Sequence, residues 1–162
     1  MDKAKRMKVL VVEQDLGSRL SYVAIARSGG WDALSCDHHS DVIGLIRQHG
    51  IGVLVTDHSR NFGFDTLRKV RAAGLSLPAI LVTSHHYSRT DAQQLGVEAV
   101  LHKPPDVPAL RKVLMEVEEV LRRDPDFAAI FRFLERCKVS SAKGTAHPPS
   151  PFQRVPQNSA AT

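Results

Sequence analysis

Short apolar runs alternate along the first 123 residues with longer segments in which apolar side chains recur every three or four positions. The clearest runs cover residues 7–12, 51–55, 79–82 and 99–101, and residues 31–36 form a weaker fifth. Continuous apolar runs of this length are typical of strands that are covered on both faces. The longer segments have helical periodicity. Because strands alternate with helices through short connections, the pattern predicts an α/β domain with a doubly wound, five-stranded parallel sheet and right-handed crossovers.

Helix boundaries are marked by capping residues and glycines. Ser40 is placed to cap the second helix, which ends before Gly50. The segment 88–91 resembles a capping box at the start of the fourth helix, which ends at Gly96. The fifth helix carries the strongest amphipathic stripe in the chain.

The chain changes character after residue 123. Pro125 interrupts the pattern, and a Phe-rich stretch within 124–138 predicts one additional helix. Residues 139–162 are rich in Ser, Ala, Pro, Gly and Gln and have too few apolar side chains to pack, which favours a flexible tail. We therefore expect a domain over 1–123, an extra C-terminal helix and a tail. The apolar side chains of the extra helix need burial, so a homodimer is one expectation.

Composition narrows the classes of protein to consider. The 162 residues are 43% hydrophobic but only 6% aromatic, as expected for a core of Val, Leu, Ile and Ala. The net charge of +5 owes +3 to Lys138, Lys143 and Arg154, so no direct nucleic-acid surface is expected on the domain. No segment approaches the roughly 18 apolar residues of a membrane span. Cys36 and Cys137 form no CxxC pair, and we expect free thiols and a cytoplasmic protein.

Four of the predicted strands deliver a polar side chain at their carboxyl end. These are Glu13, Asp57, Thr83 and Lys103. In an open parallel sheet such ends converge on one edge, where these folds place their chemistry. Carboxylates, a hydroxyl and an ammonium group on one edge suit a divalent cation and a phosphoryl group.

Four segments at those strand ends carry a resemblance to a known family. They are Val11-Val-Glu-Gln-Asp15, Val53-Leu-Val-Thr-Asp57, Leu81-Val-Thr-Ser84 and Leu101-His-Lys-Pro104. In this order, on a five-fold strand–helix pattern, they resemble the receiver domain of bacterial two-component response regulators, over about residues 7 to 123. The resemblance implies a flavodoxin-like sheet with strand order 2-1-3-4-5.

The resemblance also implies an activity, which is phosphorelay signalling and not enzymatic turnover. Asp57 would accept a phosphoryl group from a phosphohistidine on a sensor histidine kinase or phosphotransfer protein. Mg²⁺ would be held by Glu13, Asp57 and the backbone carbonyl of Ser59, because Mg²⁺ prefers oxygen ligands. Lys103 would neutralise the phosphoryl oxygens.

In such a domain a hydroxyl switch reports phosphorylation to a partner. Thr83 would move toward the phosphoryl group, and the small Ser84 would leave the site open. The face from Ser88 to Arg122 would then bind a downstream target protein. Pro104, which follows the lysine, is a candidate for a cis peptide bond.

Two departures from the family pattern favour an alternative function. The second carboxylate after the first strand is replaced by the neutral Gln14, which should lower the affinity for Mg²⁺, although the Gln14 amide oxygen or the Asp15 carboxylate could still serve as a ligand. The aromatic switch position is occupied by Val100. The alternative is a degenerate receiver that acts as a phosphorylation-independent interaction module.

Two further hypotheses come from the same strand ends. Four histidines, His58, His85, His86 and His102, adjoin them and could bind a transition metal or tune dephosphorylation. A flavin- or nucleotide-binding enzyme on the same fold is disfavoured, because Glu13 and Asp15 would repel a phosphate and no glycine-rich phosphate motif is present.

Overall fold

The computed structural model describes residues 6–57, 62–84 and 89–123. Five strands alternate with five helices in the order β1 (Lys8–Val12), α1 (Leu16–Ser28), β2 (Asp32–Cys36), α2 (Val42–His49), β3 (Val53–Asp57), α3 (Phe62–Ala72), β4 (Ala79–Thr83), α4 (Arg89–Gln94), β5 (Val97–His102) and α5 (Val107–Arg123). The predicted alternation is therefore confirmed. The expected helix within 124–138 and the tail over 139–162 lie outside the described residues.

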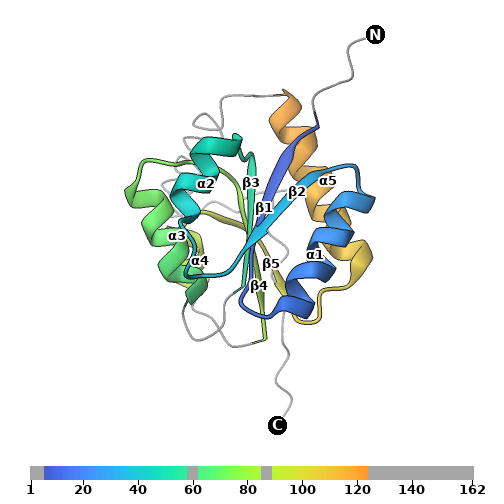
Figure 1. Ribbon diagram of the computed structural model, residues 1–162, viewed down its shortest axis with the longest axis horizontal. Coiled ribbons are helices and arrows are strands. Elements are labelled where there is room, and N and C mark those ends of the chain that lie inside the picture. The colour runs from blue at the N-terminus through green and yellow to red at the C-terminus, as the bar shows by residue number, and fades with distance from the viewer. Residues whose placement is uncertain (1–5, 58–61, 85–88, 124–162) are drawn as a thin grey trace, which may run out of the picture.

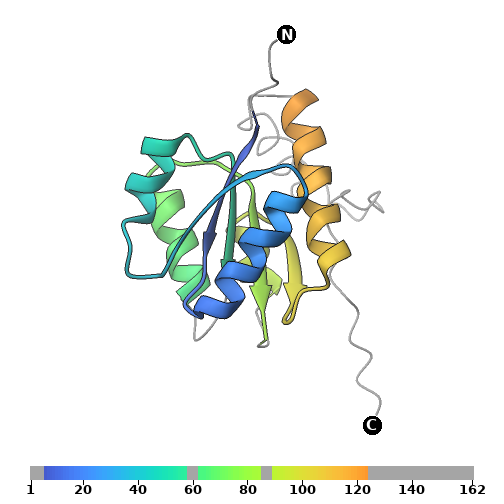
Figure 2. The same cartoon turned by 45° about the vertical axis from the view of Figure 1, so that its right-hand side comes forward.

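The strands form one sheet in the order β2-β1-β3-β4-β5, and every neighbouring pair is parallel. This confirms the predicted doubly wound sheet and its strand order. Helices α1 and α5 cover one face, and α2, α3 and α4 cover the other (Figure 1). The turned view in Figure 2 shows α1 and α5 lying side by side on their face. The chain proceeds from β1 to β2 on one side and then to β3 on the other side of β1, so the direction of winding reverses between β1 and β3. The carboxyl ends of these two strands therefore flank the position where such folds bind ligands.

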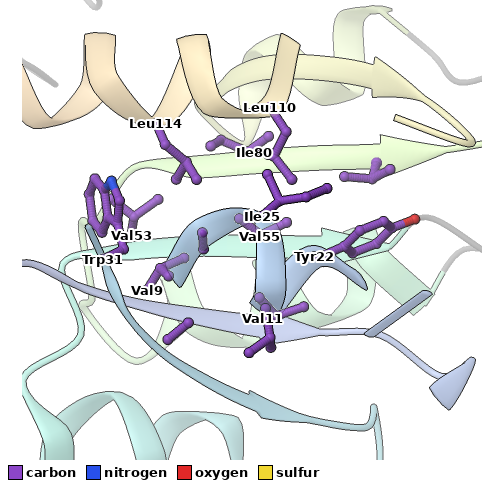
Figure 3. Packing of buried hydrophobic residues seen from close by; sticks show 14 of the residues in the cluster. Val9, Val11, Tyr22, Ile25, Trp31, Val53, Val55, Ile80, Leu110 and Leu114 are labelled. Atoms are coloured by element: carbon purple, nitrogen blue, oxygen red, sulfur yellow. The ribbon is translucent and has the colours of Figure 1, made fainter. Parts of the chain in front are cut away.

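Each face of the sheet packs its own apolar core. On the α1–α5 face, Val9, Val11, Val53 and Val55 alternate along β1 and β3 and meet side chains of the two helices, including Leu110 and Leu114 (Figure 3). On the other face the intervening residues Leu10 and Leu54 pack against α2 and α3. Strand side chains alternate between faces, so both sets being apolar explains the continuous runs in the sequence.

Short polar side chains fix the helix ends near the carboxyl edge of the sheet. Asp15 caps α1 and accepts a hydrogen bond from the Ser18 amide at 2.7 Å. The expectation that Ser40 caps α2 was wrong, because the cap is Asp41, which accepts from the Gly44 amide at 2.9 Å. Ser40 instead belongs to the turn before it.

The opposite edge of the sheet is held by Arg71 in the last turn of α3. Its guanidinium donates to the carbonyl oxygens of Leu75 at 3.0 Å and Leu77 at 2.8 Å, which precede β4. It also donates to Leu95 at 3.1 Å and Gly96 at 3.4 Å, which precede β5. One side chain thus joins the amino ends of two strands. Within the described ranges, no helix is long and apolar enough to cross a membrane.

Candidate functional site

Buried polar side chains gather at the carboxyl edge of the sheet. Among the residues that the structure describes, the buried polar set is Glu13, Thr56, Asp57, Thr66 and Thr83. Three of these five stand at or directly after the last residue of a strand, and Thr56 stands directly before the last residue of β3. Burying a polar group is costly unless it finds a partner. Their concentration at one edge therefore indicates a site and not general core packing.

The centre of this site is an ammonium group shared by two carboxylates. Lys103 Nζ lies 2.8 Å from Glu13 Oε2 and 2.7 Å from Asp57 Oδ1. The side chains of Glu13 and Asp57 are each 1% exposed, whereas the side chain of Lys103 is 18% exposed. The structure therefore brings together three of the four residues that the sequence placed on this edge. The lysine closes the site on its more open side.

Burial and ion pairing act on the pKa values of these groups in opposite directions. Burial raises the pKa of Glu13, although the hydrogen bond from Lys103 offsets part of the rise. Burial alone would lower the pKa of Lys103, but hydrogen bonds to Asp57 and Glu13 outweigh it and raise that pKa. Two carboxylates facing one ammonium leave the site with a surplus of negative charge.

Contacts with the backbone help to position Glu13 and Lys103. Glu13 Oε1 accepts from the Asp15 amide at 2.9 Å, and the Glu13 carbonyl accepts from Arg19 at 3.2 Å. The Lys103 amide donates to the Thr83 carbonyl at 2.8 Å, which joins the ends of β4 and β5. The Lys103–Pro104 peptide bond is cis, the geometry for which Pro104 was a candidate.

The remaining residues predicted for the site are placed differently. Thr83 is fully buried, and Ser84 is exposed directly after it. Gln14 and Asp15 are both exposed. The Asp15 carboxylate caps α1, and its hydrogen bonds to Ser18 lower its pKa. Val100 is buried in the core under α3 and α4.

Several candidates fall outside the part of the chain that the structure describes. These are Ser59 with its carbonyl ligand, His58, His85 and His86. His102 is described and exposed. The transition-metal hypothesis thus stays a hypothesis. Across the described ranges, no group of three or more His, Cys, Asp or Glu residues could hold a metal ion.

The chemistry of the donors nevertheless suits Mg²⁺. In proteins this ion is commonly held by one or two carboxylates, with water and phosphate oxygens completing its shell. Glu13 and Asp57 supply two such carboxylates, and the surplus negative charge of the site favours a cation. Gln14 adds no charge. The residues present therefore fit a weakly held Mg²⁺.

Sequence reasoning missed two residues beside this site, His38 and Thr66. His38 follows β2 and Thr66 lies in α3, and their side chains approach to 3.5 Å between Nδ1 and Oγ1. Thr66 is 8% exposed. No periodic signal links a residue after the second strand to one inside the third helix. Only the threonine at an otherwise apolar helix position could have pointed to it.

No protein-family model matches the chain, and no curated protein matches it. Solved structures do. The C-terminus of RcsC from E. coli, with a linker region and phosphoreceiver domain, aligns at 20% identity and a TM-score of 0.67, over 78% of this chain and 51% of that one. The chain has the fold of a response regulator receiver domain.

Two further receiver structures agree. The receiver domain of the Francisella response regulator 1452 aligns at 20% identity with a TM-score of 0.61, over 73% of this chain and 98% of that one. The chemotaxis protein CheY4 from Vibrio cholerae aligns at 19% identity with a TM-score of 0.62, over 69% of this chain and 98% of that one. The likeness to receiver structures covers 69–78% of this chain and shows the fold, while activity has to be argued from the site.

Proposed function

We propose that this protein is a phosphoacceptor receiver in which Asp57 takes a phosphoryl group from a phosphohistidine on a sensor histidine kinase or phosphotransfer protein. The observation that carries the proposal is the Lys103 ammonium held 2.7 Å from the Asp57 carboxylate. A buried carboxylate beside a cation, at the edge where doubly wound sheets bind ligands, is arranged for transfer of an anionic group.

The transfer needs little covalent chemistry from the protein. An Asp57 carboxylate oxygen attacks phosphorus, the P–N bond to the donor imidazole breaks, and the imidazole leaves with that electron pair. Lys103 binds the phosphoryl oxygens and limits the repulsion between the two anions. Bound Mg²⁺, held by Glu13 and Asp57, would neutralise further charge as the phosphoryl group passes. The orientation of Asp57 comes from β3 and from its contact with Lys103.

Exposed apolar side chains lie on two helices that begin at the same edge of the sheet as the acceptor, which supports a docking role for the donor protein. Leu16 and Leu20 of α1 are 58% and 57% exposed, and Val107 at the start of α5 is 48% exposed. Both helices begin at the carboxyl edge of the sheet and pack together. A donor helix that covered these side chains would present its phosphohistidine to Asp57.

The switch part of the proposal rests on Thr83. Its hydroxyl group is buried at the end of β4, and its carbonyl is tied to the Lys103 amide. Movement of either residue toward a phosphoryl group would therefore be transmitted to the segment between them, which includes α4 and β5. We propose that the face from Ser88 to Arg122 binds the downstream target. The protein then carries a signal in the cytoplasm and performs no substrate turnover.

One observation favours a second function, a phosphorylation-independent interaction module. Gln14 is neutral and exposed, and Glu13 pairs directly with Lys103, so the site already contains a cation of its own. A protein in which this pairing is permanent would bind partners in one state only.

A phosphorylation assay separates the two functions. The protein is incubated with Mg²⁺ and a small acyl phosphate, and its intact mass is recorded. A receiver gains one phosphoryl mass, and Asp57→Asn abolishes the gain. Asp65→Asn, at an exposed carboxylate on α3, is the matched control and should leave the gain unchanged. A wild-type protein that gains no mass at any Mg²⁺ concentration would favour the interaction module.

A further inference from the structure

The contact between His38 and Thr66 joins two elements that flank the acceptor site. His38 lies in the loop between β2 and α2, and Thr66 lies in the second turn of α3. Of the five buried polar side chains in the described ranges, Thr66 is the one that does not stand at a strand end. Its hydroxyl is within reach of Nδ1 of His38, either as a donor to it or as an acceptor from Nδ1–H.

The loop that carries His38 is fixed from its other side. Asp37 Oδ1 accepts from the amides of His39 and Ser40, both at 3.0 Å, and from the Ser40 hydroxyl at 2.9 Å. These bonds define a turn in which the Asp37 side chain accepts hydrogen bonds from the two residues that follow His38. His38 lies within this turn, and its side chain reaches Thr66 of α3.

The contact joins two elements that neighbour the strands whose carboxylates form the site. β2 lies beside β1, and the Glu13 amide donates to the Cys36 carbonyl at 3.1 Å, so the end of β2 is tied to Glu13. α3 is the helix that follows β3, which ends in Asp57. β1 and β3 are also paired directly, with Val12 opposite Thr56, so the contact from the loop after β2 to α3 adds a side-chain restraint to that backbone pairing.

The electrostatic surroundings of His38 agree with this position. Burial lowers the pKa of the His38 imidazole, the charges of Asp57 and Asp37 raise it, and those of His39 and Lys103 lower it. The imidazole therefore interacts electrostatically with two of the three charged groups of the site, Asp57 and Lys103. The contact with Thr66 adds a mechanical link, through the elements that it joins, to this electrostatic coupling.

We propose that His38 is a positioning residue of the phosphoacceptor site. By bridging to Thr66 it holds the loop after β2 and α3 in place around the paired ends of β1 and β3, and so fixes the orientation of the Glu13 and Asp57 carboxylates toward Lys103, Mg²⁺ and the incoming phosphoryl group. The inference rests on the proposed function. A misplacement of about 1 Å at such a site can cost up to about a hundredfold in rate, so a loosened bridge should slow phosphotransfer while leaving donor binding intact.

The test is a double-mutant cycle on the phosphorylation rate, with acetyl phosphate as donor at saturating Mg²⁺. We expect His38→Ala and Thr66→Val each to lower the maximal rate about tenfold, with the half-saturating donor concentration changed less than about twofold. The double variant should be no slower than either single variant, because both remove the same contact.

Conservative variants separate this role from a merely structural one. His38→Asn keeps a hydrogen-bonding group near the position of Nδ1, and Thr66→Ser keeps the hydroxyl, so both should restore the rate to within about twofold of wild type. Thermal unfolding is recorded for every variant. Rates within twofold of wild type in both disruptive variants, additive losses in the double variant, or failure of a conservative variant that folds normally would overturn the proposal.

A second measurement does not depend on phosphorylation. The ¹³C resonances of the Glu13 and Asp57 carboxyl groups, recorded for the unphosphorylated protein, should move in Thr66→Val and return in Thr66→Ser. If the wild-type protein accepts no phosphoryl group, the proposed function is wrong and these resonances alone decide. Unmoved carboxyl resonances in Thr66→Val would then overturn the positioning role.

Discussion

The two edges of the sheet are held together in different ways. At the amino edge, Arg71 donates to four backbone carbonyls, and each bond joins a side chain to the main chain. At the carboxyl edge, Lys103 is held by the side chains of Glu13 and Asp57. The main-chain acceptors are neutral and already engaged by Arg71, whereas the carboxylates and the ammonium group carry charge that a metal ion or phosphoryl group can share. We conclude that the contacts at the amino edge serve the stability of the fold, whereas those at the carboxyl edge form a site for a charged ligand.

The two ends of the α1–α5 core also differ, because one lies at the amino edge of the sheet and the other at the carboxyl edge. In Figure 3, Trp31 lies at one end of the α1–α5 core, and the Tyr22 hydroxyl points toward the other end, where the strands finish. Burial is the main reason that the pKa of Tyr22 is raised, and the charges of Lys103, Glu13 and Asp57 also act on it. The core is thus continuous with the functional edge on one side only. Trp31, the single tryptophan, can report global unfolding from a distance.

Removing the cation should have the largest effect on stability. Lys103→Met leaves two carboxylates buried without their counter-charge, which typically costs about 3–5 kcal/mol in the free energy of unfolding. Urea unfolding at pH 7, followed by Trp31 fluorescence, measures the loss. Lys112→Met, at an exposed lysine of α5, is the control. A loss below about 1 kcal/mol would mean that the lysine behaves like an ordinary surface partner.

Removing the amino-edge contact should cost less and leave phosphorylation intact. Arg71→Ala leaves four carbonyl groups without their donor, and hydrogen bonds to charged groups contribute about 1.5–3 kcal/mol each in favourable cases. We expect a total loss of about 2–3 kcal/mol because water reaches part of this edge. Arg68→Ala, whose partner Asp65 is exposed, should change stability little. A change in the phosphorylation rate of folded Arg71→Ala would break the distinction between the edges.

Restoring a second carboxylate beside Glu13 should strengthen the binding of Mg²⁺ at the carboxyl edge. Gln14→Asp adds a negatively charged oxygen ligand beside Glu13, and we expect the affinity for Mg²⁺ to rise about tenfold, since carboxylate number tunes such sites. Isothermal titration with Mg²⁺ measures it. Gln48→Asp, in the last turn of α2, adds the same charge elsewhere and should leave the affinity unchanged. Equal gains in both variants would show that net charge alone is responsible.

The smallest expected effect is a dependence of stability on pH. Because the folded-state pKa of Glu13 is raised above its usual value, the folded protein binds more protons than the unfolded chain between the two pKa values. The contribution of Glu13 to stability therefore declines as pH rises through that window, upward from about 4.5. Glu13→Gln should remove this decline, and Glu119→Gln should not. Unfolding curves that keep the same slope against pH in Glu13→Gln would contradict the raised pKa.

The sheet was predictable from the sequence because its strands are covered on both faces. Val9 to Val12 serve two cores at once, which produces the unbroken apolar runs that define each strand. The edge location of Glu13, Asp57 and Lys103 followed from strand polarity alone. Parallel strands leave little choice about where their ends meet.

The finer contacts were not predictable, because they depend on which residues the folded loops bring together. Ser40 and Asp41 both suit a helix cap, and only the folded turn shows that Ser40 bonds to Asp37 while Asp41 caps α2. The pairing of His38 with Thr66 joins residues 28 positions apart that share no periodicity. Such pairings depend on the registration of loops against helices, which a one-dimensional pattern does not encode.

Locating the phosphoryl group tests the central claim most directly. The protein is phosphorylated with a small acyl phosphate donor. The acyl phosphate formed on the protein is then reduced with borohydride, and the converted residue is located by peptide mass spectrometry. We expect conversion at Asp57, lost in Asp57→Asn and slowed in Lys103→Met, because the ammonium lies 2.7 Å from that carboxylate. Conversion at another carboxylate, or none in a folded protein supplied with Mg²⁺, would contradict it.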